Sequence, residues 1–155
     1  MKKPLLVLSL LAALSSCKTN EETAAYLQKE DAAFVLNVEA TPCFGECPVY
    51  TMQINDKGVS TFNGKRFVDP VGQQVKYLPK WEVDSLKLVL LENNFFELDS
   101  IYDSNITDVP AFSVSFEAKG GTNIKHFVIG RAGYPKDFER IKAFIERVRK
   151  RNYAQ

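Results

Sequence analysis

Two cysteines, Cys43 and Cys47, have the clearest capacity for chemistry in this chain. On an extended strand their Cα atoms would lie about 13 Å apart. A disulfide needs Cα atoms within about 7 Å, so the chain must fold back before the two sulfurs can bond. We expect Gly45 to permit that reversal, because glycine tolerates backbone angles that other residues avoid. Pro42 and Pro48 stiffen the two flanks.

Four interpretations of the cysteine pair are open. A structural disulfide is the usual fate of paired cysteines in an oxidising compartment. A reversible thiol site is the second, although thioredoxin-like motifs have C-x-x-C spacing and this chain has C-x-x-x-C. The third is a metal site: the spacing resembles that of copper chaperones of the respiratory chain, and His126 would complete a donor set for Cu(I). Free, unpaired thiols are the fourth.

Other residues offer weaker candidates. Ser113 and Ser115 have no partner histidine or acid at a recognisable nucleophile elbow, so we find no catalytic constellation and expect no enzyme and no cofactor. Tyr77 and Trp81 are expected to pack into the core or at a helix start, with an exposed aromatic ligand patch as the alternative. His126 lies in an alternating segment, where a packed or surface side chain is the plainer expectation.

The N-terminus has the pattern of an export signal. Two lysines precede an apolar run at 5–14, which is too short for a bilayer that needs about 20 residues. The following Leu-Ser-Ser-Cys resembles the lipobox of bacterial lipoprotein signal peptides. The resemblance implies cleavage before Cys17 and lipidation of its sulfur, with two or three acyl chains that hold the protein firmly at a membrane.

Cysteine count and charge agree with export. Three cysteines are an odd number for a secreted chain, and lipidation of Cys17 would leave Cys43 and Cys47 as a pair. A formal net charge of +1 gives no broad field for nucleic acid. We therefore expect an envelope protein, specifically an outer-membrane lipoprotein that faces the periplasm or the cell surface. Its partners would be the membrane, through the lipid, and another envelope protein or a glycan.

Hydrophobic periodicity predicts the elements that must position these residues. Alternating apolar residues predict strands at 34–38, 50–54, 59–62, 112–116 and 124–129, with short edge pieces at 66–68 and 74–78. Turn signals lie at 55–58 and at Asn63-Gly64. Apolar residues at three- and four-residue steps predict helices over about 80–94 and 135–152. Residues 95–102 are expected to pack beneath the first of these helices.

These elements predict one α+β domain. An antiparallel β-meander and a β-hairpin would form one sheet, with two helices packed on one face. We divide the chain into a signal peptide at 1–16, a lipidated cysteine and polar tether at 17–32, and the domain at 33–152.

The motif Cys-x-Gly-x-Cys-Pro-x-Tyr resembles that of a domain family of unknown function common in Bacteroidota lipoproteins. It is carried here by Cys43, Gly45, Cys47, Pro48 and Tyr50, and similar segments follow at 64–67, 94–96 and 108–110. The resemblance covers about residues 33–150. It implies a shared domain and no particular activity.

Overall fold

The computed structural model describes residues 15–103, 108–121 and 123–154. The predicted signal peptide lies outside these residues except for its last two positions. The strands are β1 (Phe34–Ala40), β2 (Val49–Asn55), β3 (Val59–Arg66), β4 (Gly72–Tyr77), β5 (Ile101–Tyr102), β6 (Phe112–Ala118) and β7 (Lys125–Gly130). The helices are α1 (Ser15–Leu27), α2 (Lys80–Glu92) and α3 (Lys136–Tyr153), with a 3-10 turn, η1 (Phe95–Glu97).

The strands form one seven-stranded sheet in the order β4-β3-β2-β1-β6-β7-β5, which confirms the α+β class. Every neighbouring pair is antiparallel except β5 and β7, which run parallel. The sheet is therefore mixed. Ile101 and Tyr102 extend the sheet edge by pairing with Ile129 and Gly130. The expectation that Ile101 packs beneath a helix is wrong, since its side chain is exposed, whereas Tyr102 does pack against the core.

Strand β3 is longer than its sequence predicts. Asn63 and Gly64 were expected to form a turn, but both pair with β2 and β4, and the strand ends only at Arg66. The reason is a close backbone approach: a Cβ atom at Gly64 would overlap the carbonyl oxygen of Pro70 and lie 2.8 Å from Cγ2 of Val68. Glycine at this position makes room for the returning turn rather than forming it.

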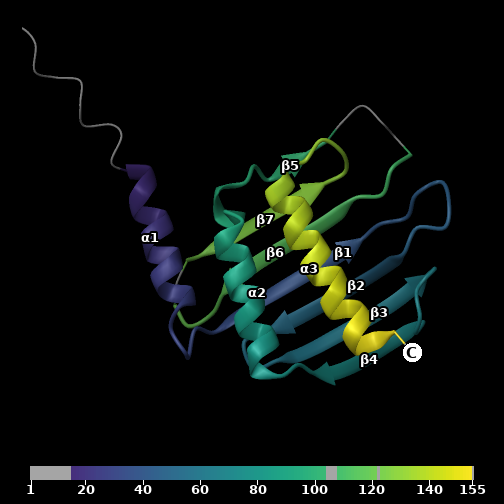
Figure 1. Ribbon diagram of the computed structural model, residues 1–155, viewed down its shortest axis with the longest axis horizontal. Helices are drawn as coiled ribbons and strands as arrows, with labels where there is room; N and C mark the ends of the chain where they lie inside the picture. Colours follow the sequence, from purple (N-terminus) through teal and green to yellow (C-terminus); the bar gives the residue numbers. More distant parts are fainter. Residues whose placement is uncertain (1–14, 104–107, 122, 155) are drawn as a thin grey trace, which may run out of the picture.

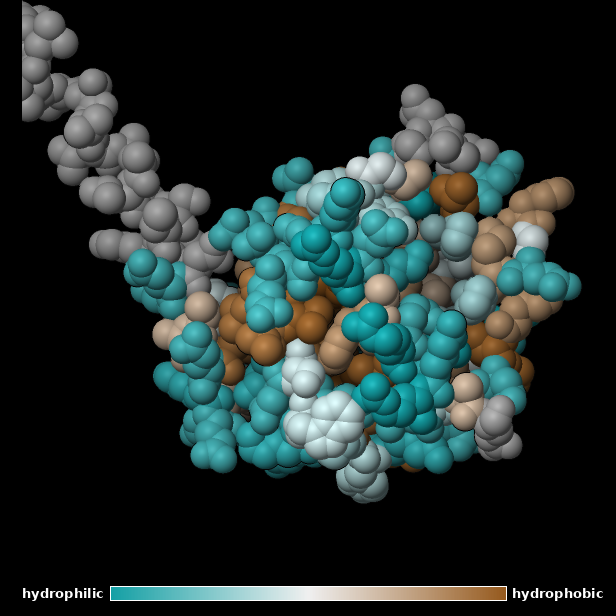
Figure 2. Space-filling model, in the orientation of Figure 1, coloured by the Kyte–Doolittle hydropathy of each residue, from teal (hydrophilic) through white to brown (hydrophobic). Residues whose placement is uncertain are grey.

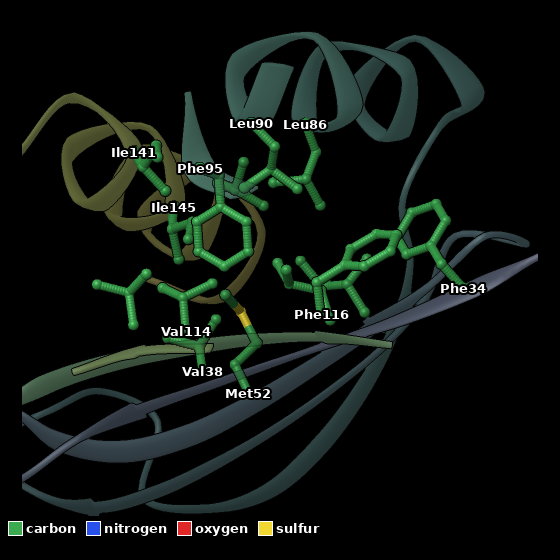
Figure 3. Packing of buried hydrophobic residues seen from close by; sticks show 14 of the residues in the cluster. Phe34, Val38, Met52, Leu86, Leu90, Phe95, Val114, Phe116, Ile141 and Ile145 are labelled. Carbon is green, nitrogen blue, oxygen red and sulfur yellow. The ribbon is translucent and has the colours of Figure 1, made fainter. Parts of the chain in front are cut away.

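Helices α2 and α3 lie side by side across the same face of the sheet (Figure 1). Both bury an apolar stripe: Val83, Leu86 and Leu90 in α2, and Phe138, Ile141, Ile145 and Val148 in α3. Figure 3 shows Leu86 and Leu90 of α2, and Ile141 and Ile145 of α3, pointing with Phe95 toward the apolar side chains of the strands. All of these residues belong to one buried cluster between helices and sheet. Because side chains alternate along a strand, burying this face leaves the other without helical cover among the described residues.

Buried polar contacts fix the helices in place. The Glu82 carboxylate on α2 is buried and accepts hydrogen bonds from Arg151, at 2.9 Å, and Asn152, at 3.1 Å, on α3. The Tyr153 hydroxyl donates to the buried Ser60 on β3, with its carbonyl oxygen at 2.9 Å. The outer surface of this helical layer is mainly hydrophilic, with smaller hydrophobic patches (Figure 2).

The segment expected to be a polar tether is helical over its first part. Helix α1 runs to Leu27, whose side chain is buried with Ala32. The Tyr26 hydroxyl donates to the carbonyl oxygens of Ala33, at 2.7 Å, and Lys119, at 2.9 Å. Apolar contact and hydrogen bonds thus dock the end of α1 against the domain beside the start of β1, as Figure 1 shows.

We predict that Gly64→Ala lowers the free energy of unfolding by about 1–3 kcal/mol, because the added methyl group must displace backbone atoms. The matched control is Gly45→Ala, where a Cβ would meet nothing closer than Cys43 Sγ at 4.0 Å. That change should stay within about 0.5 kcal/mol. Urea denaturation of both variants measures the difference, and equal stabilities would contradict the close approach at Gly64.

Candidate functional site

Cys43 and Cys47 form a disulfide in the loop that joins β1 to β2, with their Cα atoms 5.7 Å apart. The chain therefore folds back as the spacing required. The expected role of Gly45 in the reversal is wrong, since its φ angle is not positive and a Cβ atom at this position would have free space. Its N–H instead donates to Cys43 Sγ at 3.2 Å. Phe44, at the tip of this loop, is 92% exposed.

Tyr50, the last residue of the motif, is fully buried and ties β2 to α3. Its hydroxyl donates to Glu146 Oε1, and the Arg149 guanidinium lies 5.2 Å from the centre of its ring. Arg149 also donates two hydrogen bonds to Glu146 Oε2, at 2.8 and 3.0 Å. Arg149 is itself buried. Burial, followed by the charge of Glu146, raises the pKa of Tyr50 well above its usual value, so the phenol stays protonated.

His126 does not lie near the disulfide. It pairs with Phe116 on β6, which in turn pairs with Leu36, whereas the disulfide loop begins beyond Ala40. This register separates His126 from the loop by about 13 Å along the strands alone. The two sulfurs are also bonded to each other, so the geometry brings together no copper-binding set. The reversible-thiol hypothesis stays a prediction for this exposed loop.

His126 is instead packed between aromatic rings on the helix-covered side. The ring centre of Phe95 lies 5.2 Å away in an edge-to-face arrangement, and Phe96 lies at 6.2 Å. Its Nε2 is buried and has no hydrogen-bond partner among the described residues. Burial lowers the pKa of His126, an effect only partly opposed by the hydrogen bond to the Leu98 backbone. The imidazole is thus held neutral, as a structural group.

The sheet face without helices carries two parallel rows of polar side chains. One row runs Ser115, Asn37, Gln53 and Thr61 across β6, β1, β2 and β3, and the next runs Ser113, Glu39, Thr51 and Asn63. Of the described side chains in these rows, only Glu39 carries a charge. The amides are already oriented: Gln53 donates to Asn37 at 2.7 Å, and Asn37 donates to Ser115 at 3.4 Å.

These eight side chains line a shallow hollow of about 380 Å³, which we name the open-face groove. Asn37, Thr51, Thr61, Ser113 and Ser115 are half-buried in it. Because amides and hydroxyls both donate and accept hydrogen bonds, the groove can recognise an uncharged ligand rich in such groups. The sequence signal for this groove was the set of polar residues that alternate with the apolar ones along each strand. Only the pairing register of the strands brings these polar residues together in one groove.

Ser113 and Ser115 lie in this groove without a catalytic partner. The only histidine, His126, points to the opposite face, since it pairs with the buried Phe116. Ser115 Oγ is already an acceptor for the Asn37 amide. The described side chains therefore assemble no serine nucleophile with a base.

Exposed aromatic rings lie at the ends of the groove. Phe127 pairs with Ser115 at one end and is 46% exposed. Tyr77, on edge strand β4, is 79% exposed and lies on the same face. Trp81 is 56% exposed, under the Arg151 guanidinium at 5.1 Å. Neither ring belongs to the core: Tyr77 ends the edge strand β4, whereas Trp81 lies in the first turn of α2 against Arg151 of α3. Core packing is therefore wrong for both residues, and packing at a helix start holds for Trp81.

Comparison with known families assigns the domain. Residues 34–149 match the family model described as a domain of unknown function, DUF6438. This chain belongs to the DUF6438 family. The match covers β1 to most of α3, including the disulfide loop, the Tyr50 contacts and the open-face groove. No curated protein matches the chain.

A second match concerns membrane attachment. Residues 1–17 match the model of a prokaryotic membrane lipoprotein lipid attachment site, which ends at Cys17. This match supports a membrane-anchored lipoprotein that carries a DUF6438 domain. Among the described helices, none has the length and apolar character to cross a bilayer.

We predict that the double variant Cys43→Ser with Cys47→Ser folds but melts earlier. Closing a five-residue ring should stabilise the DUF6438 domain by about 2 kcal/mol in the chain-entropy model. Thermal unfolding followed by circular dichroism measures the change, with the loop-tip variant Phe44→Ala as control. Unchanged melting of the double variant would contradict a bracing role.

A pH dependence follows from His126. Its pKa is lower in the folded state than the ordinary value of about 6.5, so the unfolded chain binds a proton that the folded domain resists. The free energy of unfolding should therefore fall as pH drops from about 7.5 to 5.5, and His126→Phe should remove part of this slope. Urea titrations across this window test it. Identical slopes for both proteins would show that His126 is not the group responsible.

Proposed function

We propose that this protein is a lipid-anchored, non-enzymatic binding module of the cell envelope, with the open-face groove as its binding surface. The observation that carries the proposal is the groove itself: oriented amides and half-buried hydroxyls on a sheet face that no described helix covers. A sheet surface that only faces solvent does not require such an aligned, nearly uncharged set of amides and hydroxyls for stability. A fixed set of donors and acceptors does suit the reversible recognition of a polar partner.

The position of the anchor supports this use of the groove. Lipidated Cys17 would lie on α1, which docks beside the start of β1. Tyr26 on α1 lines a pocket together with Phe96 and His126, so α1 lies on the helix-bearing side. Anchored there, at an outer membrane, the domain would keep its open face unobstructed toward the periplasm or the cell surface.

The disulfide motif takes a supporting role in this proposal. The Cys43–Cys47 bond holds the loop that sets the ends of β1 and β2, the two strands that carry Asn37 and Gln53. Pro48 immediately precedes β2, and Tyr50 connects that strand to α3 through its hydrogen bond to Glu146. The motif would therefore hold the strands beneath the groove in position without contacting the bound partner.

The proposal predicts where a partner contacts the protein. A photo-crosslinking amino acid at Thr51 or Thr61, in the open-face groove, should give a covalent adduct in intact cells that make the full lipidated chain. The same amino acid at Leu88, an exposed position on α2, is the matched control and should give none. Gel shift and mass spectrometry identify the adducts. Adducts from Leu88 alone, or from no position, would overturn the assignment of the binding surface.

A further inference from the structure

We infer that the ligand of the open-face groove is an extended, neutral glycan that crosses the strands. This inference rests on the proposed function and adds the chemical class, the direction and the length of the ligand. It follows from three features of the groove: its charge, its hydrogen-bonding groups and the rings at its ends.

The charge of the groove selects against anionic polymers. The two central rows contain one charged side chain, the Glu39 carboxylate, and no cation among the described residues. Nucleic acids and polyanionic glycans bind through Lys and Arg contacts to their charges. Here they would meet only a carboxylate, so a neutral ligand is favoured.

The hydrogen-bonding groups select against a protein partner. Protein interfaces exclude water with an apolar, often aromatic core, whereas the centre of this groove is Asn37, Gln53 and Thr61. Asn37 and Thr61 are half-buried and Gln53 is exposed. Covering them with apolar side chains would leave their donors and acceptors unpaired away from water, which is costly. Sugar rings present hydroxyls in adjacent pairs, and each amide can donate to one hydroxyl and accept from its neighbour.

The rings at the two ends give the ligand a direction and a length. The row that contains Asn37 begins at Phe127 on β7 and ends at Val75 on β4, two residues before Tyr77. It crosses six neighbouring strands. Five spacings of about 4.8 Å make it about 24 Å long, the length of about five pyranose units in an extended chain. The exposed ring of Phe127 lies in line with the row, and that of Tyr77 lies beside its other end, about 7 Å along β4 from Val75. Terminal sugars can stack their C–H faces on these two rings.

The test is binding of neutral oligosaccharides to the full-length lipidated protein in detergent, followed by calorimetry. The probes are the pentasaccharides and disaccharides of cellulose, starch and chitin, with pentagalacturonate as the anionic comparison. At least one neutral pentasaccharide should bind, at least about tenfold more tightly than its disaccharide, since the shorter ligand reaches only one ring. Absence of binding by all three pentasaccharides at millimolar concentration, or tighter binding of pentagalacturonate, would overturn the inference.

Variants test the individual contacts. Tyr77→Ala should weaken pentasaccharide binding about fivefold, the size expected for one lost stacking contact, and Gln53→Ala about tenfold. Phe44→Ala, which removes a more exposed ring outside the groove, is the matched control and should change nothing. Melting temperatures verify that each variant is folded. Equal loss in Phe44→Ala, or no loss in either groove variant, would place the glycan elsewhere.

The two proposals fail separately. If crosslinks from Thr51 lead to a protein and no pentasaccharide binds, the glycan inference is wrong while the open-face groove remains the binding surface. If neither crosslinks nor oligosaccharides involve the groove, the proposed function is wrong as well.

Discussion

A single sheet that buries only one of its faces determines most of what this molecule can do. Phe34, Leu36 and Val38 must face α2 and α3 to leave water, and burial of such side chains is the main favourable term in folding. Since side chains alternate along each strand, Val35, Asn37 and Glu39 must then lie on the opposite face of the sheet. The hydrophobic layer thus places the polar rows on the opposite face as surely as it forms the core.

Polar contacts then fix how the helical layer sits on that sheet. Apolar packing alone is weakly directional, but Glu82 with Arg151, and Tyr50 with Glu146, specify which residues of α3 lie over α2 and β2. Glu82 and Tyr50 are buried and Glu146 is half-buried, so each of these three groups would be costly to leave unpaired. The chemistry-bearing motif and the helix positions are consequently parts of one arrangement, and the disulfide loop emerges from the strand that this arrangement holds.

The division of the molecule into two surfaces suits an anchored binding protein. The helical side carries α1, through which the lipid attachment site connects to the domain, and has a mainly hydrophilic outer surface (Figure 2). The other side carries an oriented, almost uncharged set of amides and hydroxyls with aromatic rings at its ends. The loop that joins β1 to β2, which carries the disulfide, lies at the end of the sheet away from α1 (Figure 1).

The sequence by itself determined what depends on local order. Alternation predicted β1, β2, β6 and β7, three- and four-residue steps predicted α2 and α3, and cysteine count and spacing predicted the disulfide. Prediction from the local sequence pattern failed where residues far apart in the chain determine the conformation or the burial of a residue. Gly64 has the sequence context of a turn glycine, but the backbone of Pro70 lies against it within a strand. Tyr77 is apolar enough for the core, but its place on edge strand β4 leaves it exposed.

Only the tertiary structure decided the candidate site. Ser115, Asn37, Gln53 and Thr61 belong to four strands, and nothing in their local sequences distinguishes them from ordinary solvent-facing residues. Strand register aligns them in one row, and the same register carries His126 to the other face and away from the cysteines. Register is set by pairing between segments far apart in the chain, and for that physical reason one-dimensional periodicity reveals the strands but not the surface they make together.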